Sequence, residues 1–222
     1  MSVKLVSVTK GLGELSNLTP EELIAYCARV SNPENQMNSE TSAKLLAYCI
    51  KNKHWSVFEQ VDLGVEVVTS RAIAAQILRH RSFCFQEFSQ RYAKAIKAVA
   101  QEARRQDVKN RQNSLDDLTP ETKQWFKDKQ TEIITLSQKY YEEALEKGIA
   151  KESARFLLPL NTTTKLYIKG SVRSWITYLM VRLDKATQLE HRQVAEGCWN
   201  VFKEEFPIIS GVLKEMQPEL FK

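Results

Sequence analysis

The strictest pattern in the chain is an alternation of apolar and polar side chains over residues 60–68, QVDLGVEVV. Aliphatic side chains occupy every second position from Val61 to Val67, and Asp62 and Glu66 lie between them. A period of two places the aliphatic side chains on one face of an extended segment. The pattern therefore predicts a β-strand with one buried face, which leads directly into a helix.

The rest of the chain is divided into elements by capping residues, prolines and periodicity. Thr19, Pro20 and Glu22 form a capping box that predicts a helix start, and Pro33 discourages continuation of that helix. Ser70 is the expected N-cap of a helix over 70–80. We further expect strands over 2–9 and 162–170 and helices over 39–52, 119–147, 174–179, 188–205 and 207–217, with a short helix before Pro159. These elements predict a single domain over residues 1–222 with an α+β fold, in which helices flank an antiparallel sheet.

Size and composition are those of an ordinary globular domain, because 43% of the 222 residues are hydrophobic and 27% are charged. No apolar run is long enough to cross a bilayer, and the N-terminus lacks the anatomy of a signal peptide, so we expect a cytoplasmic protein without membrane contact. The four cysteines show no metal-ligand spacing and are interpreted as reduced thiols rather than zinc ligands or disulfides. The net charge of +5 suits nucleic acid, a membrane surface or small polyanions and does not choose among them.

Residues 94–117 are polar and charge-rich, with few large apolar side chains. A basic interaction arm and a solvated surface insertion would both have this composition. We favour the surface insertion.

The basic tripeptide Arg79-His80-Arg81 follows the predicted helix over 70–80. A helix C-terminus favours each nearby cation by about 0.3–1 kcal/mol, which does not account for so many cations at one place. Arginine grips phosphate through two parallel hydrogen bonds, so an anionic ligand is expected. The following segment, residues 82–92, interleaves aromatic and polar side chains, as in a half-buried extended segment that lines a cleft.

The spacing of this cluster resembles a known signature. Arg79-His80-Arg81 is followed after seven residues by Ser89, and then by Arg91 and Tyr92, as in the flavin-dependent thymidylate synthases. The resemblance covers nearly the whole chain apart from residues 94–117. It implies methylation of dUMP to dTMP, with FAD as cofactor and NADPH and methylenetetrahydrofolate as co-substrates. It also implies a homotetramer with shared active sites, in which Arg79 and Arg182 of one site come from different chains.

Further segments extend the resemblance to an FAD site. The run from His54 to Glu59 is similar to the family's His-x-Ser/Thr-x-Phe-Glu-His block, although Gln60 stands where a second histidine is usual. The resemblance assigns to FAD the residues Ser31, His54, Ser56, Glu59, Arg79, His80, Arg81, Ser82, Glu87, Ser171, Val172, Arg173 and Thr177. Ser171 replaces a usual asparagine, and Thr177 a usual amide or histidine. By residue type alone, Ser31 fits a polar helix end equally well, and a single histidine such as His54 is more often structural.

A second set of residues is implied for dUMP. Arg155 lies in ARFLLPLN, which resembles the family's Ala-Arg-x-x-Leu-Pro-Leu block, and residues 182–190 are similar to its Arg-x-x-x-x-Ala-Gln-x-Glu-Ile-Arg run. The residues implied are Gln76, Arg79, Glu87, Phe88, Ser89, Gln90, Arg91, Arg155 and Arg182. Arg79, Arg91 and Arg155 would hold the phosphate. Arg182 is the candidate catalytic residue, because a guanidinium against the uracil N3/O4 edge would stabilise negative charge that develops there.

Three alternatives remain open at this stage. Cys84 lies beside the arginines and could be a nucleophile, but a small packed residue is favoured because the flavin route needs no protein adduct.

The departures at Gln60, Ser171 and Thr177 leave room for a hydroxymethyl product instead of a methyl product. The net charge and the aromatic-basic interleaving of residues 83–92 would also suit a non-enzymatic binder of RNA or single-stranded DNA, a less favoured reading.

Overall fold

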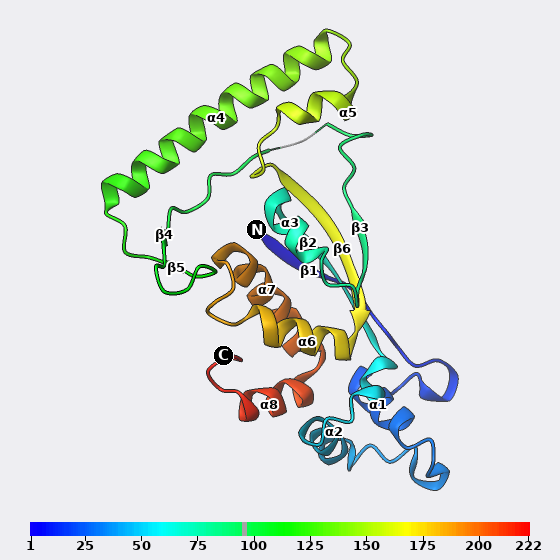
Figure 1. The fold of residues 1–222 in the computed structure, drawn as a ribbon. Coiled ribbons are helices and arrows are strands. Elements are labelled where there is room, and N and C mark those ends of the chain that lie inside the picture. The colour runs from blue at the N-terminus through cyan, green and yellow to red at the C-terminus, as the bar shows by residue number, and fades with distance from the viewer. Residues whose placement is uncertain (95–96) are drawn as a thin grey trace.

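A four-stranded antiparallel sheet forms the centre of the computed structural model, which describes residues 1–94 and 97–222 (Figure 1). The strand order is β1 (Ser2–Val8), β2 (Asp62–Ser70), β6 (Thr163–Ser171) and β3 (Cys84–Glu87). The strand predicted from the alternating pattern is β2, which pairs with β1 on one side and β6 on the other. The aliphatic side chains of its predicted inner face are buried, including Val61 and Leu63.

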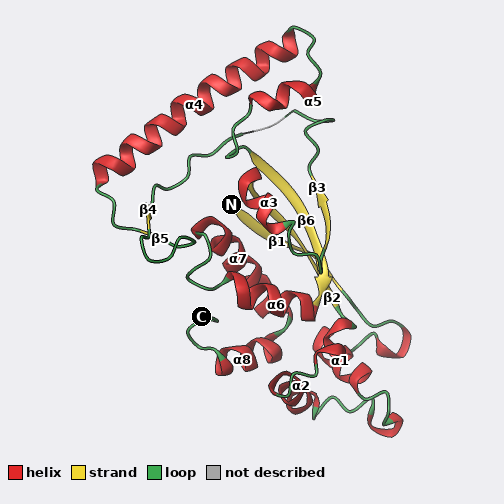
Figure 2. Cartoon of the chain, viewed as in Figure 1, coloured by secondary structure: helices red, strands yellow, loops and turns green. Residues whose placement is uncertain are grey.

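Helices flank this sheet, which confirms the predicted α+β fold (Figure 2). They are α1 (Pro20–Ala28), α2 (Ser42–Lys51), α3 (Arg71–Ile77), α4 (Pro120–Glu146), α5 (Lys151–Ala154), α6 (Val172–Arg182), α7 (Leu189–Glu205) and α8 (Pro207–Met216). Short 3-10 turns occur at Gly13–Leu15, Pro33–Asn35, Trp55–Glu59 and Arg155–Leu157. In the part of the chain that the structure describes, no helix is both long enough and apolar enough to span a bilayer.

The predicted starts of α1 and α3 are accurate, but both helices end earlier than predicted, while α2 begins at Ser42 rather than 39 and α6 at Val172 rather than 174. Thr19 forms the capping box with Glu22, and the Ser70 hydroxyl accepts a hydrogen bond from the Ile73 amide. However, α1 ends at Ala28 and α3 at Ile77. Beyond α3 the backbone tightens into bonds between residues three apart, such as His80 N–H to the Ile77 carbonyl at 3.0 Å. The basic tripeptide therefore lies in the turn after the helix rather than at its last residues.

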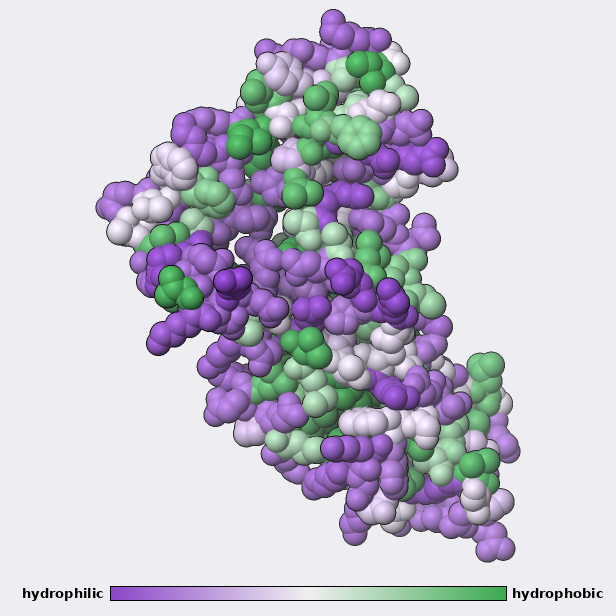
Figure 3. Space-filling view, viewed as in Figure 1, coloured by the Kyte–Doolittle hydropathy of each residue, from purple (hydrophilic) through white to green (hydrophobic). Residues whose placement is uncertain are grey.

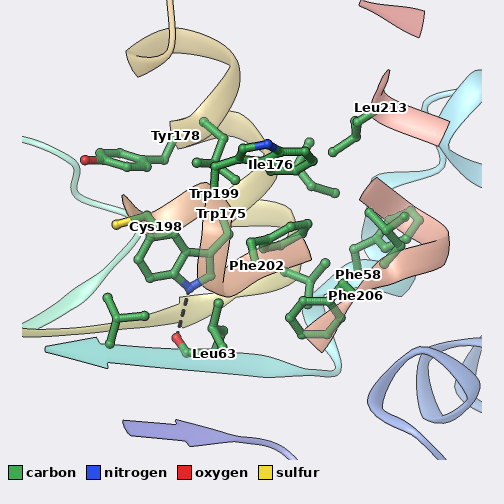
Figure 4. Packing of buried hydrophobic residues seen from close by; sticks show 14 of the residues in the cluster. Phe58, Leu63, Trp175, Ile176, Tyr178, Cys198, Trp199, Phe202, Phe206 and Leu213 are labelled. Carbon is green, nitrogen blue, oxygen red and sulfur yellow. Dashed lines mark hydrogen bonds between the residues drawn. The ribbon is translucent and has the colours of Figure 1, made fainter. Parts of the chain in front are cut away.

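The core lies between the sheet and the helices α6, α7 and α8 (Figure 4). Trp175 of α6 is buried and donates from its indole nitrogen to the carbonyl of Leu63 on β2, over 2.9 Å. A buried indole needs such an acceptor, so this bond fixes α6 against the sheet. Arg173 and Arg182, near the two ends of α6, are positioned by the same packing.

Helix α4 lies apart from α6, α7 and α8 (Figure 1). Its apolar side chains recur at helical spacing, yet Trp125, Ile133, Leu136 and Tyr140 are all exposed. Apolar side chains are visible on the surface of the α4–α5 arm in Figure 3. A contiguous apolar stripe of this kind marks an interaction surface more often than an ordinary solvated face.

The charged stretch 94–117 contains a small hairpin of β4 (Arg105–Gln106) and β5 (Ser114–Leu115), and residues 95 and 96 lie outside the described residues. Arg104 donates to the hydroxyl and the carbonyl of Ser114, both at 3.0 Å. Most of its described residues are surface-exposed. However, Gln112 at the hairpin tip lines a hollow beside α6, and the sequence did not predict this position.

Candidate functional site

An open hollow of about 620 Å³ lies where α3, the end of α6, the loop after it and the hairpin tip meet. Its lining residues are Gln76, Gln112, Met180, Val181, Arg182, Asp184, Ala186, Thr187 and Gln188. Gln76 and Arg182, both predicted to contact dUMP, thus share one wall. A smaller hollow of about 250 Å³ at the end of β2 is lined by none of the predicted site residues.

Arg182 is a cation without an acidic partner. Its Nε donates a hydrogen bond to Nε2 of His80 over 2.8 Å, which joins the end of α6 to the basic tripeptide. Among residues 1–94 and 97–222, no carboxylate lies within 4.0 Å of Arg182. A partly buried guanidinium that faces a hollow without a counter-ion favours a ligand that carries or develops negative charge.

His80 is held neutral by its surroundings. Burial and the charge of Arg182 lower its pKa from 6.5 to about 4. Because Nε2 accepts from Arg182, the single ring proton of the neutral imidazole is on Nδ1. His80 therefore orients Arg182 without cancelling its charge.

A second histidine reaches the hollow from behind. His191 of α7 is fully buried, and its pKa falls from 6.5 to about 3, mainly through burial and then through the charge of Arg182. It contacts Gln76 through Nδ1 and the Tyr178 hydroxyl through Nε2, each at 3.2 Å. Sequence reasoning missed His191 and Tyr178. The only signal was that His191 lies three residues after Gln188, on the same side of the helix.

Two of the three arginines expected at the phosphate, Arg91 and Arg155, lie around α5. Arg91 pairs with the Glu152 carboxylate at 2.9 Å, and Arg155 donates to the Glu152 carbonyl at 3.1 Å. Arg79 and Arg81 are exposed, and in the described part of the chain no carboxylate lies within 4.0 Å of either. Neither Arg91 nor Arg155 lines the hollow that holds Arg182. Within one chain, therefore, the predicted phosphate group and Arg182 belong to separate surfaces.

The segment after the basic tripeptide is anchored along β6. Glu87 contacts Arg71 at 3.1 Å and accepts from the Thr164 hydroxyl at 2.9 Å, while the Phe88 amide donates to the Lys165 carbonyl. The Ser89 hydroxyl accepts from the Arg91 amide at 3.3 Å. Gln90 is buried, and its Nε2 has no hydrogen-bond partner among the described residues. An unsatisfied buried donor here suits a ligand oxygen.

Three predicted flavin segments meet at the start of α6. Arg173 forms an ion pair with Glu59 at 3.0 Å, and the Ser174 hydroxyl donates to the Ser82 carbonyl at 3.2 Å. The start of α6 carries the partial positive charge of a helix N-terminus, which suits a pyrophosphate, while the Val172 amide donates to the Val61 carbonyl and the Ser174 amide to the Ser171 hydroxyl. Arg173 is a cation at this helix start, and the exposed Arg81 directly precedes Ser82, so the residues present fit the anionic part of FAD.

Other predicted flavin residues have different partners in this chain. The Ser171 hydroxyl caps α6 by accepting from the Ser174 amide, and the Thr177 hydroxyl donates to the Arg173 carbonyl. His54 lies edge-on to the Tyr48 ring. Val172 is buried, whereas Ser31 and Ser56 are exposed. Their contacts with FAD stay predictions, and the hydroxyls of Ser171 and Thr177 are already engaged by helix backbone.

The sequence of this chain is similar to those of several known proteins. Residues 14–208 match the family described as "Thymidylate synthase complementing protein". The chain is 56% identical to the flavin-dependent thymidylate synthase of Synechocystis sp. over 96% of its own length and 100% of the relative's. It is 53% identical to a probable flavin-dependent thymidylate synthase of Paramecium bursaria Chlorella virus 1, with 96% and 99% covered.

A solved structure has the same fold. The crystal structure of a UMP/dUMP methylase, PolB from Streptomyces cacaoi, bound with 5-Br dUMP, superposes with a TM-score of 0.81. It is 21% identical, and the superposition covers 96% of this chain and 94% of that one.

Proposed function

The chain belongs to the flavin-dependent thymidylate synthase family, and from this premise we propose that it methylates dUMP to dTMP with methylenetetrahydrofolate, NADPH and FAD. The observation that carries the proposal is the position of Arg182. This guanidinium has no carboxylate partner in the described residues, is oriented by a neutral His80, and shares a hollow with Gln76.

Arg182 is the residue to which we assign transition-state stabilisation. Attack by C5 of uracil requires electron density to move into the ring, and negative charge then develops toward N3 and O4. A fixed guanidinium beside that edge stabilises this charge without reorganising. Since His80 supplies only a neutral acceptor, Arg182 retains its full charge for the substrate.

Arg173 and the start of α6 are proposed to hold FAD, together with the basic tripeptide and the run from His54 to Glu59. The ion pair of Arg173 with Glu59 keeps the guanidinium at the helix start, where the helix dipole adds a partial positive charge. When bound, FAD supplies the hydride that completes the methyl group, so the protein itself needs only to bind, orient and polarise.

Arg91 and Arg155 are proposed to bind the nucleotide phosphate. Their common neighbour Glu152 brings them together on an exposed surface, where a dianionic phosphate would compete with the carboxylate for Arg91. Exposed ion pairs contribute only about 0–1 kcal/mol, so this exchange costs little.

We further propose a homotetramer with shared sites, working in the cytoplasm. The exposed apolar stripe of α4 and the exposed Phe156 and Leu160 beside Arg155 would be covered by other subunits. Subunit contacts there would bring the phosphate arginines of one chain to the Arg182 hollow of another. The four cysteines carry free thiols, as in a reducing compartment.

The deciding experiment is an assay of the purified protein with dUMP, methylenetetrahydrofolate, NADPH and FAD, in which the product nucleotide is identified by mass. We expect dTMP, and omission of FAD should abolish its formation. A hydroxymethyl nucleotide would instead indicate the related transfer reaction. Nucleic-acid binding that weakens steeply with salt, in a protein that takes up no flavin, would support the non-enzymatic alternative.

A further inference from the structure

A continuous chain of hydrogen bonds runs from the buried core to the wall of the hollow. The Tyr178 hydroxyl and His191 Nε2 are 3.2 Å apart, as are His191 Nδ1 and Gln76 Oε1. Gln76 Nε2 donates to Gln188 Oε1 over 2.6 Å, and Gln188 Nε2 donates to Glu190 over 2.9 Å. We call these five residues the relay. Gln76 and Gln188 are its members on the wall of the hollow.

The direction of the relay is fixed by its end at Glu190. A carboxylate only accepts, so Gln188 presents its N–H to Glu190 and its carbonyl to Gln76. Gln76 must then donate to Gln188, which turns its own carbonyl toward His191. The reverse orientation would place the Gln188 carbonyl against the carboxylate.

His191 and Tyr178 form the other end of the relay. Its pKa of about 3 keeps the ring neutral, so it carries one proton, which must be on Nδ1 to reach the Gln76 carbonyl. Nε2 is then the acceptor for the Tyr178 hydroxyl. Every member of the relay is thus paired in a single direction. The Gln76 carbonyl points toward a fully buried ring, and its amide nitrogen lies on the side of Gln188 and the hollow.

We propose that the relay makes Gln76 a specificity-determining residue, because it offers the substrate an N–H and withholds its carbonyl. One amide hydrogen is bound to Gln188 and the second is left for a ligand. Arg182 on the same wall is also only a donor. The pyrimidine edge that meets them must carry an acceptor, such as the C4 carbonyl oxygen of uracil. Cytosine presents an amino group at C4 and would leave donor facing donor. This inference rests on the proposed function.

His191 and Glu190 act through Gln76 and are therefore positioning residues. The family run quoted above has isoleucine where this chain has His191. Isoleucine cannot donate to the Gln76 carbonyl, so a relay anchored at both ends is a property of this chain's own residues.

Substitution of Glu190 by glutamine tests the direction of the relay, since Glu190→Gln keeps the shape but lets position 190 donate. Gln188 and Gln76 can then both turn around, with His191 taking its proton on Nε2, and every bond is still made. The Gln76 carbonyl would then lie on the side of the hollow. The readout is the ratio of the dissociation constants of dCMP and dUMP, measured by calorimetry on the full-length, FAD-loaded protein.

We expect this ratio to favour dUMP in the parent and to fall about tenfold or more in Glu190→Gln. His191→Ile, which removes the donor for the Gln76 carbonyl, should lower it as well. Glu196→Gln is the matched control on α7, because Glu196 is exposed and contacts only Arg192, at 3.8 Å, as an ion-pair partner among the described residues. Its ratio should stay within about twofold of the parent.

The inference is overturned if both relay variants bind dUMP and keep the parental ratio. Because a glutamine at position 190 can also keep the parental direction by accepting through its carbonyl, Gln76→Glu, which offers only acceptor oxygens to the hollow and should also lower the ratio, decides if His191→Ile does not fold. If the parent converts dUMP but the variants keep the parental ratio of dissociation constants, the relay is refuted and the proposed function still stands. A parent that does not bind dUMP would refute both.

Discussion

Arg182 and His80 are joined by a hydrogen bond of 2.8 Å in which the guanidinium Nε donates to a neutral imidazole. A buried cation is usually paired, and a carboxylate partner neutralises an arginine as it orients it. Here burial and the guanidinium itself keep the pKa of His80 at about 4, so the acceptor carries no charge in neutral solution. The arrangement separates orientation of the cation from its neutralisation.

Removal of Arg182 should therefore affect the chemical step more than binding. We expect Arg182→Ala to lower kcat by about 10²–10³-fold, which is typical for loss of one donor that stabilises developing charge. The measurement is tritium release from 5-tritiated dUMP, with FAD affinity determined in parallel. Lys51→Ala is the control, because Lys51 is an exposed cation on α2 that pairs with Glu215, at 3.9 Å. Normal turnover in Arg182→Ala would remove Arg182 from the reaction.

Acid should destabilise the fold through its two shielded histidines. The pKa values of His80 and His191 are about 4 and about 3 in the folded chain and near 6.5 when unfolded, so the unfolded state binds protons first. Their contribution is complete above pH 6.5 and is lost as the pH falls toward the folded values, at up to about 1.4 kcal/mol per pH unit for the fully buried His191 and less for the half-buried His80, which solvent screens.

Urea unfolding of the parent and of His191→Ile between pH 7.5 and 4.5 measures this contribution. As the pH falls, the free energy of unfolding should decrease less steeply in His191→Ile than in the parent, because the variant lacks the contribution of His191. Asn200→Ala replaces an exposed side chain of α7 that does not titrate and should leave the parental slope unchanged. Equal slopes in the parent and His191→Ile would contradict the shielding of His191.

Local signals in the sequence predicted most of the fold. The period-two pattern predicted β2, because it depends only on neighbouring residues of one strand. The capping residues Thr19 and Ser70 predicted two helix starts, because a cap depends only on residues of the first turn. The contact of His191 with Gln76 joins residues 115 positions apart and depends on how α7 packs against α3, so no local pattern contains it. The approach of Gln112 to the hollow likewise depends on the path of a polar hairpin.

The pair of Arg173 and Glu59 should control flavin affinity. Arg173→Ala removes a cation from the start of α6, and we expect FAD to bind about 10–100-fold more weakly, as follows from loss of one charge-assisted contact of about 1.5–3 kcal/mol. Glu59→Gln keeps the shape but loses the ion pair of 3.0 Å, and should weaken FAD binding less. Quenching of flavin fluorescence gives both affinities. Arg104→Ala, in the hairpin, is the control, and equal FAD affinity in all four proteins would exclude the start of α6.

Cys84 should be dispensable for catalysis. It is exposed on β3 opposite Lys169, and the flavin route requires no covalent bond between protein and uracil. Cys84→Ser is expected to keep most of the parental activity, because serine preserves the size of the side chain and removes the thiol. Tritium release from 5-tritiated dUMP provides the measurement. Near-complete loss of release, with FAD still bound, would restore the thiol as a nucleophile.

Sharing of sites between subunits gives a prediction that a single chain cannot explain. Arg182 contacts His80 of its own chain. Arg79 directly precedes His80 in the sequence, but it is exposed and has no acidic partner among the described residues. If Arg79 serves a site completed by the Arg182 of another chain, Arg79→Ala and Arg182→Ala should each retain only trace activity alone. Mixed after subunit exchange, they should recover part of the activity, since some sites then receive both native arginines. Exchange is verified by mass spectrometry of differently labelled subunits, and verified exchange without recovery would show that each site uses arginines of one chain.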